Sequence, residues 1–354
     1  MAFTPVPSES KSQINKAGKI LVQDNPFDID FDWALNLADR WRACHAYPIN
    51  TFQATLRNRI DSLSSSDSYI VAQRLKRMPT IIDKLKRYPA MQLTTMQDIG
   101  GVRAVLGSCE DVYRLTEKYE NSGLLIHELI DKKDYIQNPR SSDGYRSMHL
   151  IYKYKNKRNP NYNGLRLELQ IRTKLQHTWA TAVETMGTFL GQALKSRQGS
   201  QEWLDFFAII SSAFSHIENR PPVPRYGHLS CIDTFQEVRR AEARIRALEM
   251  MQGISVAAEQ IIKSRGQGKS WSYHLIVLNS LERTVQITAY DRENFEQAAS
   301  DYSKAETDAV KGQKIEPVLV SAGPIDTLRR AYPNFFLDIG EFTAKVREII
   351  SEIP

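Results

Sequence analysis

The sequence predicts an α/β (α+β) fold, with a mixed sheet flanked by helices and a small C-terminal ββαβα domain joined to it by a helical linker. Three observations support this prediction. Strand-like runs alternate with segments of helical periodicity from about residue 26 to 217, which is typical of a sheet covered by helices. A proline-rich break follows at 218–227. Strand patterns return only after about residue 270.

The composition is that of a globular chain with a moderate excess of positive charge. Its 354 residues are 42% hydrophobic and 25% charged, with a net charge of +6, which allows about two domains and favours polyanions such as nucleotides or RNA. Cys44, Cys109 and Cys231 lie far apart, which indicates neither a disulfide framework nor a zinc site. The absence of a secretory or membrane-spanning pattern leads us to expect a cytoplasmic protein without a membrane partner.

The chain is expected to begin with an arm and two helices. Residues 1–25 are polar and contain Pro5 and Pro7, which predicts a flexible arm. Residues 31–41 place aromatic and aliphatic side chains on one helical face, and a second helix is predicted over 52–63.

Five strand patterns and three helices then follow. Pro79 is well placed to begin a helix that ends at Arg87, a second helix is predicted over 110–123, and a long helix begins near Thr173. The last two strands flank a polar turn and predict a hairpin. The strand patterns cover 69–76, 101–107, 124–130, 148–154 and 165–171.

The segment "GLRLELQIRT" alternates apolar and polar residues without a break, so one face of its strand carries two guanidiniums, a carboxylate and an amide. These side chains belong to Arg166, Glu168, Gln170 and Arg172. A half-buried antiparallel strand often presents such a face to water. The alternative is that this face forms the floor of a reaction site.

The C-terminal part is predicted to be a linker and a second domain. The segment from 232 to 264 is alanine-rich and charged, which predicts a long helix that acts as a spacer. The predicted divisions are an arm at 1–25, a catalytic domain at 26–217, a linker at 218–270 and a small domain at 271–354.

A strand end and a helix N-terminus, both edged with cations, suit the binding of phosphate. Arg74 and Lys76 share a face of the first strand. The helix that follows carries Thr80, Lys84 and Arg87 on one side. The alternative interpretation is a solvated basic face.

Two further segments add carboxylate and aromatic chemistry. Asp98 precedes a glycine pair and Arg103; together with Glu168 it would provide the one or two carboxylates that Mg²⁺ usually takes from a protein. The loop around Arg140 and Tyr145 could stack on a base while cations hold phosphate. An ordinary turn and an ordinary surface loop are the alternatives.

These motifs, taken together, resemble the RelA/SpoT alarmone synthetase domain in order and spacing, over about 110 residues. They read Arg74-x-Lys76, Lys84, Asp98-x-x-Gly101-x-Arg103, Gly144-Tyr145-Arg146-Ser147-x-His149, Glu168-x-Gln170-Ile171-Arg172-Thr173 and Trp179-Ala180.

The resemblance implies a nucleotidyltransferase-like fold and transfer of pyrophosphate from ATP to a nucleotide hydroxyl, with release of AMP. It assigns Mg²⁺ to Asp98 and Glu168, polarisation of the attacking hydroxyl to Glu168, and stacking on the acceptor base to Tyr145. The ATP-binding residues would be Arg74, Lys76, Thr80, Lys84, Arg87 and Arg103. The acceptor-binding residues would be Arg140, Tyr145, Arg146, His149, Gln170 and Arg172.

Two departures qualify this resemblance. No His-Asp dipeptide is present, so the metal-dependent hydrolase half of long alarmone enzymes is not indicated. Asp143 stands before Gly144, where alarmone synthetases commonly carry an amide, and a negative charge there fits a free guanosine diphosphate poorly. The hairpin tip mixes cations with Tyr152, Tyr154 and Tyr162, which suits single-stranded RNA ends, although a solvated turn is the alternative.

A synthetase domain followed by a small ββαβα module resembles fused toxin-antitoxins of the CapRel type. That resemblance implies transfer of pyrophosphate to the 3′ end of tRNA, inhibition of translation, and an autoinhibitory C-terminal domain that senses a phage capsid protein or another phage protein. Tyr332 and Phe335 would form the autoinhibitory aromatic pair; core packing is the alternative. A (p)ppGpp synthetase that uses GDP or GTP and a non-catalytic RNA-binding sensor remain as alternative functions. The sequence leaves the trigger and the oligomeric state open.

Overall fold

A computed structural model of the chain describes residues 3–23, 25, 30–63, 69–120, 126–189, 201–245, 247–248, 251, 273–279, 284–291, 293–313, 315–321 and 340–352. The chain divides into two compact units. The first comprises residues 1–133 and 148–171, and the second comprises 134–147 and 172–354. The second unit thus begins inside the predicted 26–217 domain.

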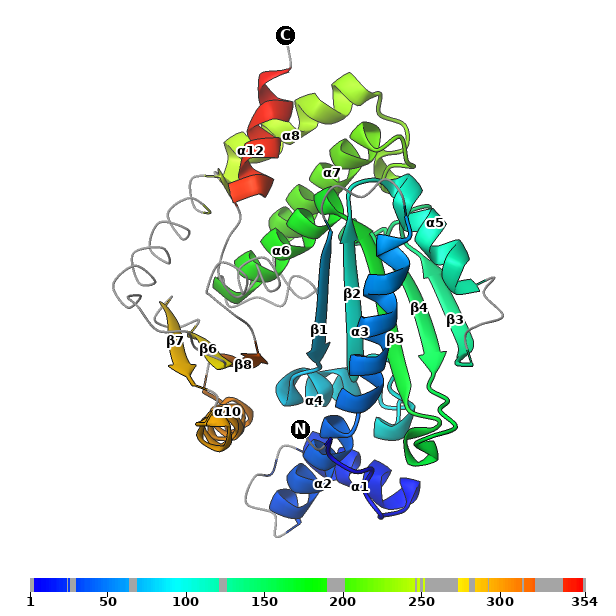
Figure 1. Cartoon of the computed structure of the whole chain (residues 1–354). Helices are drawn as coiled ribbons and strands as arrows, with labels where there is room; N and C mark the ends of the chain where they lie inside the picture. Colours follow the sequence, from blue (N-terminus) through cyan, green and yellow to red (C-terminus); the bar gives the residue numbers. More distant parts are fainter. Residues whose placement is uncertain are drawn as a thin grey trace. The chain divides into compact units, whose positions relative to one another are not determined.

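The first unit is built on a five-stranded sheet in the order β1-β2-β5-β4-β3 (Figure 1). β1 is antiparallel to β2, and β4 is antiparallel to β5. The predicted mixed sheet and the predicted hairpin are therefore confirmed. The strands are β1 (Ile70–Leu75), β2 (Gly100–Leu106), β3 (Glu128–Asp134), β4 (Met148–Lys153) and β5 (Arg166–Thr173).

Strand β5 has the two-faced character that its sequence predicts. Leu167, Leu169 and Ile171 are fully buried, whereas Glu168 and Gln170 on the other face are half-buried. Burial of the three aliphatic side chains fixes the register of the strand, because a shift by one residue would exchange the two faces.

Helices α3 (Ala46–Asp61) and α5 (Cys109–Glu120) cover one face of this sheet (Figure 1). A Cβ atom added to Gly100 would lie 3.0 Å from Ile49 and 3.2 Å from His45, so α3 approaches the backbone of β2 closely. Consecutive strand residues point to opposite faces. Gly101 and Arg103 therefore point away from α3, towards the other face of the sheet.

The N-terminal segment is a packed helix, and the prediction of a flexible arm over 1–25 was wrong in this part. Helix α1 (Lys11–Val22) begins with a capping box formed by Ser10 and Gln13. It buries Ile14, Ala17 and Leu21. The helix forms because these apolar residues recur at helical spacing, a pattern that the polar composition of the segment obscured.

Helix α1 supports the elements that lead to Asp98. It contacts α2 (Phe31–Ala43), α4 (Met78–Arg87) and the short helix η1 (Leu93–Thr95). Asn15 donates to Gln92 at 3.0 Å and accepts the backbone N–H of Thr94 at 3.0 Å. These bonds fix the turn that precedes β2.

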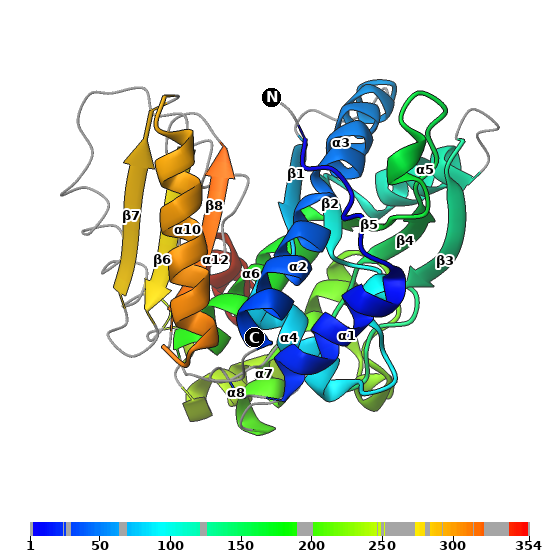
Figure 2. The ribbon, with the colours of Figure 1, turned by 90° about the horizontal axis from the view of Figure 1, so that it is seen from below.

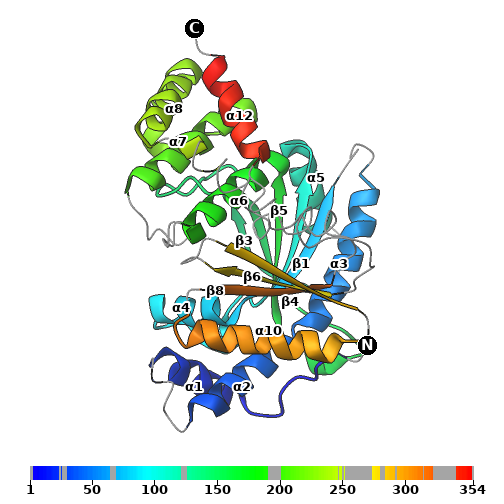
Figure 3. The same cartoon turned by 90° about the vertical axis from the view of Figure 1, so that its left-hand side faces the viewer.

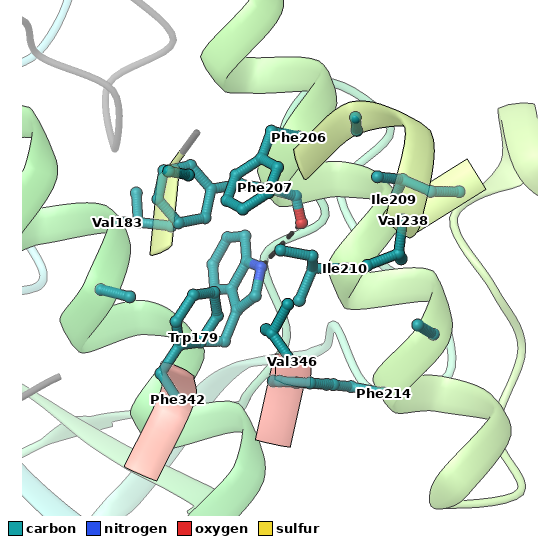
Figure 4. Packing of buried hydrophobic residues seen from close by; sticks show 14 of the residues in the cluster. Trp179, Val183, Phe206, Phe207, Ile209, Ile210, Phe214, Val238, Phe342 and Val346 are labelled. Carbon is teal, nitrogen blue, oxygen red and sulfur yellow. Dashed lines mark hydrogen bonds between the residues drawn. The ribbon is translucent and has the colours of Figure 1, made fainter. Parts of the chain in front are cut away.

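Helices in the described part of the second unit surround one apolar cluster; Figure 3 shows these helices and Figure 4 shows side chains of the cluster. Trp179 lies in this cluster and donates its Nε1–H to the carbonyl of Phe207 at 2.8 Å. The ring of Phe342 lies 6.1 Å from that of Phe207 and 5.9 Å from that of Phe214. The helices are α6 (Lys174–Phe189), α7 (Gln201–Ile217), α8 (Cys231–Ile245) and α12 (Gly340–Ser351).

Two predictions for the C-terminal part differ from the structure. The predicted spacer helix begins as α8, which packs on α7 and buries Phe235 and Val238 instead of standing free. The last predicted helix, α12, packs on α6 and α8. Both helices carry apolar residues at helical spacing, and that spacing does not reveal which distant surface the apolar face will cover.

A three-stranded antiparallel sheet forms the remainder of the described C-terminal part. Its strand order is β7-β6-β8, and α10 lies across one face (Figure 2). This arrangement matches the ββαβ part of the prediction. The elements are β6 (Tyr273–Asn279), β7 (Thr284–Tyr290), α10 (Phe295–Val310) and β8 (Ile315–Ser321). The predicted autoinhibitory pair, Tyr332 and Phe335, lies outside the described residues.

Within the described part of the chain, no helix combines the length and the apolar character that a membrane span requires.

Candidate active site

Asp98 lies immediately before β2 and accepts two charged hydrogen bonds on one oxygen. Lys76, which follows β1, donates to Asp98 Oδ2 at 3.0 Å, and Lys84 of α4 donates to the same oxygen at 2.9 Å. Burial would raise the pKa of Asp98, but the two ammonium groups outweigh burial and hold that pKa below its usual range. Asp98 is therefore a carboxylate at neutral pH.

The second oxygen of Asp98 is available to a ligand. Asp98 Oδ1 is buried and accepts no hydrogen bond from the described residues. A buried carboxylate oxygen without a partner is costly, and it fits the oxygen chemistry of Mg²⁺. The described residues contain no group of three or more His, Cys, Asp or Glu side chains that could hold a metal by themselves. A cation here would thus need substrate oxygens as well.

Glu168 is the second carboxylate of the site and is half-buried. His149 Nδ1 lies 2.8 Å from Glu168 Oε1, and Gln170 Nε2 donates to Glu168 Oε2 at 2.6 Å. The antiparallel register places His149 opposite Gln170. Burial and the charge of Asp98 both raise the pKa of Glu168, but His149 and Gln170 outweigh them, so the net pKa is lowered.

The charge of Asp98 raises the pKa of Glu168, so the two carboxylates lie within electrostatic range of one another. Gly101 of β2 explains how this is possible. Its added Cβ would lie 3.9 Å from the backbone oxygens of both Arg74 on β1 and Glu168 on β5. The lack of a side chain at Gly101 leaves room on the face between these strands.

The predicted ATP-binding residues differ in how they are placed. Arg74 is paired with Gly101 across the β1–β2 ladder, and its charge acts on Lys76. Arg103 lies on the same face of β2, two residues beyond Gly101. Thr80 is half-buried in the first turn of α4. By contrast, Arg87 donates twice to Asp83 of its own helix, at 3.0 and 2.7 Å.

Lys76 itself is almost fully buried, and burial lowers its pKa even though Asp98 acts in the opposite direction. The site therefore combines two ionised carboxylates with a cluster of cations on the ends of β1, β2 and α4. Such a set suits the transfer of a charged phosphoryl-type group, which needs positioning and charge neutralisation more than covalent help.

The predicted acceptor loop is closed by an ion pair that the sequence did not reveal. Asp143 is 1% exposed and accepts two bonds from Arg140, at 3.0 and 2.6 Å. Asp143 Oδ1 also accepts the backbone N–H of Tyr145 at 3.1 Å. Gly144 has a φ of 81°, which suits glycine, and a Cβ there would lie 2.6 Å from Ser211. The charge of Asp143 is therefore neutralised inside the protein.

Two of the predicted acceptor-binding cations point into the protein. Arg146 is 3% exposed and donates to Ser211 Oγ at 2.9 Å and to the carbonyls of Ile136 and Pro221 at 3.0 and 2.7 Å. Arg172 is 2% exposed and contacts His177 Nδ1. These contacts indicate structural roles, and the predicted contacts of both residues with an acceptor have no support here.

The end of β5 is fixed to the helices that follow it. Thr173 Oγ1 accepts the backbone N–H of Gln176 at 3.1 Å and donates to Glu218. Gln176 Nε2 donates to the other oxygen of Glu218 at 2.8 Å. This arrangement is a helix cap supported by a distant carboxylate. The spacing of Thr173 and Gln176 was visible in the sequence, whereas Glu218 was not.

The aromatic residues of the hairpin tip are not available to RNA bases. Tyr152 and Tyr154 are at most 1% exposed, and Tyr162 stacks on Tyr47 with ring centroids 4.4 Å apart. These contacts therefore give no support to the interpretation of the tip as an aromatic surface for single-stranded ends. Alternation in the sequence could not show that these rings pack against α3.

Comparisons with known proteins agree with this geometry. Residues 73–187 match the family model described as "Region found in RelA / SpoT proteins". An uncharacterised protein of Mycobacterium tuberculosis is 31% identical over 148 residues, which cover 40% of this chain and 48% of that protein. The GTP pyrophosphokinase YjbM of Bacillus subtilis is 32% identical over 114 residues, covering 31% of this chain and 52% of YjbM. The chain spans about half the length of the curated relatives it matches.

The solved structures that resemble this chain include the small alarmone synthetase 1 of Bacillus subtilis bound to its product pppGpp. The likeness has a TM-score of 0.40 and 22% identity, and it covers 51% of this chain and 95% of that structure. The sequence match includes β1, β2, the acceptor loop and β5. Residues 73–187 of this chain are thus similar to the region found in RelA and SpoT proteins.

Proposed function

We propose that this protein is an ATP-dependent pyrophosphokinase that transfers the terminal pyrophosphate of ATP to a nucleotide hydroxyl. The observation that supports it best is the pair of half-buried, ionised carboxylates, Asp98 and Glu168, within the matched region. Asp98 lies between two lysine ammonium groups and keeps one oxygen without a partner.

Each part of the site has a role in this reaction. Lys76, Lys84, Arg74 and Arg103 would neutralise the phosphate oxygens of ATP. Asp98, with Glu168, would hold Mg²⁺ against those oxygens, and the ion would supply further charge neutralisation there. Because two ammonium groups hold the carboxylate of Asp98 in position, its second oxygen could bind a cation that is also bound to phosphate.

Glu168 is the group that would receive the proton. The acceptor hydroxyl oxygen forms a bond to the β-phosphorus of ATP, the bond from that phosphorus to the α–β bridging oxygen breaks, and AMP leaves. The proton of the hydroxyl passes to Glu168, which is ionised because His149 and Gln170 hold its oxygens.

For the acceptor we propose the 3′ end of tRNA, with GDP or GTP as the second candidate. The net charge of +6 and the exposed Lys157 and Arg158 at the hairpin tip favour a polyanion. The names of relatives such as GTP pyrophosphokinase YjbM favour a guanosine nucleotide. An acceptor assay separates the two.

We further propose that the part of the chain beyond residue 271 regulates the enzyme, as an autoinhibitory and sensing module of a fused toxin-antitoxin that responds to a phage protein. The described sheet β6–β8 lies in the chain between two helices, α8 and α12, that both pack in the second unit. A protein that binds this sheet could thereby act on both helices.

The acceptor is tested with ATP labelled at the γ-phosphate, Mg²⁺, and either deacylated tRNA, GDP or GTP. We expect label on the 3′ end of tRNA and release of AMP. Label only in the guanosine nucleotides would establish the second candidate. Absence of transfer to every acceptor, for the full chain and for the variant described next, would favour a non-catalytic RNA-binding sensor.

Regulation is tested by removing the small sheet while α12 is kept. Residues 273–321 lie between α8 and α12, so the segment 252–339 is replaced by a Gly/Ser linker of about 20 residues, which spans about 25 Å on average. We expect pyrophosphate transfer to rise relative to the full chain. An unchanged rate would show that this segment does not inhibit the enzyme.

A further inference from the structure

The ring of Tyr145, which the resemblance to alarmone synthetases assigns to stacking on the acceptor base, is enclosed in the structure. Tyr145 is 5% exposed. Two aromatic rings lie beside the ring of Tyr145, each in an edge-to-face arrangement. The centroid of the Tyr135 ring is 5.7 Å from that of Tyr145, and the centroid of the Trp179 ring is 6.3 Å away. The guanidinium of Arg140 lies over the ring face, 4.6 Å from its centroid. A base needs one of these neighbours to move.

Arg140 is the neighbour that can move at least cost. Trp179 is 3% exposed and is tied to the carbonyl of Phe207, so its displacement would disrupt the apolar cluster. Arg140 has a side chain that is 24% exposed, and its contacts are the ring of Tyr145 and the carboxylate of Asp143. A flexible cation at the surface can swing out without leaving a cavity in the core.

Asp143 determines how firmly Arg140 stays in place. Its carboxylate binds the guanidinium with two parallel bonds, a geometry that fixes direction as well as distance. An amide at this position could still accept the N–H of Tyr145, but it would lose the charge that holds Arg140. Asp143 is thus placed to control access to Tyr145 through Arg140.

We infer that Arg140, held by Asp143, covers the face of Tyr145 on which the acceptor base stacks, and that the acceptor binds by displacing this guanidinium. Asp143 is a positioning residue in this device. The inference rests on the proposed function, together with the predicted role of Tyr145 in stacking on the acceptor base.

The cover has a consequence for the class of acceptor. Displacement of Arg140 weakens every acceptor by the same factor, so a molecule that binds through the stacked base alone is held poorly. A polynucleotide end makes additional phosphate contacts along its backbone, and these offset the displacement. The cover leaves the ratio of the two affinities unchanged, but the end of a nucleic acid keeps enough affinity to bind, whereas a free nucleotide is held poorly.

The first test measures the cover directly, without enzyme activity. Tetranitromethane nitrates exposed tyrosines, and peptide mass spectrometry reports the rate at each one. In the wild type we expect Tyr145 to react far more slowly than Tyr88, whose residue is 50% exposed. Asp143→Asn should accelerate nitration of Tyr145 about tenfold, since loss of a charge-assisted bond shifts an equilibrium by about that factor.

The matched control is Asp134→Asn. Asp134 caps the same loop by accepting the N–H groups of Ile136 and Gln137, at 3.0 and 2.9 Å, and an amide oxygen can accept both. Asp134→Asn should therefore leave the rate of nitration of Tyr145 unchanged. The double variant Arg140→Ala/Asp143→Asn removes the cover without leaving a buried charge, and should react at least as fast as Asp143→Asn.

The second test is kinetic. Asp143→Asn should lower the KM for GTP and the KM for deacylated tRNA by the same factor, about tenfold, and leave kcat and the KM for ATP within about twofold. An equal nitration rate in wild type and Asp143→Asn overturns the inference, as does a higher acceptor KM in the double variant. If the wild type transfers no pyrophosphate but the nitration rates differ as expected, the proposed function fails while the cover stands.

Discussion

Asp98 and Glu168 are kept ionised by different partners although both are half-buried. Asp98 is held by the ammonium groups of Lys76 and Lys84, and Glu168 by His149 and Gln170. The partners of Asp98 are the ammonium groups of lysines after β1 and on α4, whereas those of Glu168 lie on β4 and β5. Asp98 is therefore suited to bind a cation, and Glu168 is suited to accept a proton.

Glu168→Gln should lower pyrophosphate transfer by at least about 10²-fold, because the amide cannot accept the proton of the attacking hydroxyl. The Tm should stay within a few degrees, since the side chain keeps its shape. Turnover is measured as AMP release. Glu128→Gln is the control. Glu128 lies on β3, is exposed and forms an ion pair with Lys155, so this variant should turn over normally. Near-normal turnover in Glu168→Gln would refute its role.

His45 makes stability depend on pH. Burial against β2 lowers its pKa from 6.5 to about 4. Between these values the unfolded chain binds a proton that the folded chain does not, so the stability falls as the pH falls from about 6.5 to about 4. The loss is about 3 kcal/mol. Urea unfolding of the wild type and His45→Gln at pH 7 and pH 4 should show this slope only in the wild type; equal slopes would contradict it.

At the scale of elements, two helices at the ends of the chain complete the cores of the two units. Helix α1 packs on α4 and η1, the elements that carry Lys84 and lead to Asp98. Helix α12 buries Phe342, Val346 and Ile349 in the cluster that also contains Trp179. Neither helix contains a predicted site residue. However, α1 packs on the helix that carries Lys84, and α12 packs in the cluster that contains Tyr145.

Phe342→Ala should lower the free energy of unfolding by about 3–5 kcal/mol, because it leaves a cavity between Phe207 and Phe214. Chemical denaturation measures the change. Glu348 lies on the exposed face of the same helix. Glu348→Ala should therefore lower the free energy of unfolding by less than about 0.5 kcal/mol. Similar losses in the two variants would show that α12 is not docked in the cluster.

The sequence predicted those elements whose signal is local. Strand β5 and its hairpin with β4 were predicted because the period of two is unbroken over the strand. Helix α1 was missed because a polar composition concealed its four apolar positions. The docking of α12 and the pairing of Thr173 with Glu218 join residues far apart in sequence, and a periodic pattern contains no information about such partners. Arg140 and Asp143 are close in sequence, but only the turn at Gly144 brings their charges together.

At the scale of the molecule, the small sheet β6–β8 is inserted between helices that belong to the second unit. A truncation near residue 268 would remove α12 along with that sheet. It should expose the apolar cluster and lower the Tm by more than about 10 °C, whereas replacement of 252–339 with α12 kept should lower it by only a few degrees. Differential scanning calorimetry compares the two, and an equal Tm would show that α12 contributes nothing to the unit.

The most direct test of the central claim is the release of AMP from ATP in the presence of Mg²⁺ and an acceptor, measured side by side for the wild type, Asp98→Asn and Glu168→Gln. We predict release by the wild type and a loss of at least about 10²-fold in both variants. Release of AMP at the wild-type rate by either variant would contradict an active site built on these two carboxylates. Failure of the wild type to release AMP with any acceptor would contradict it as well.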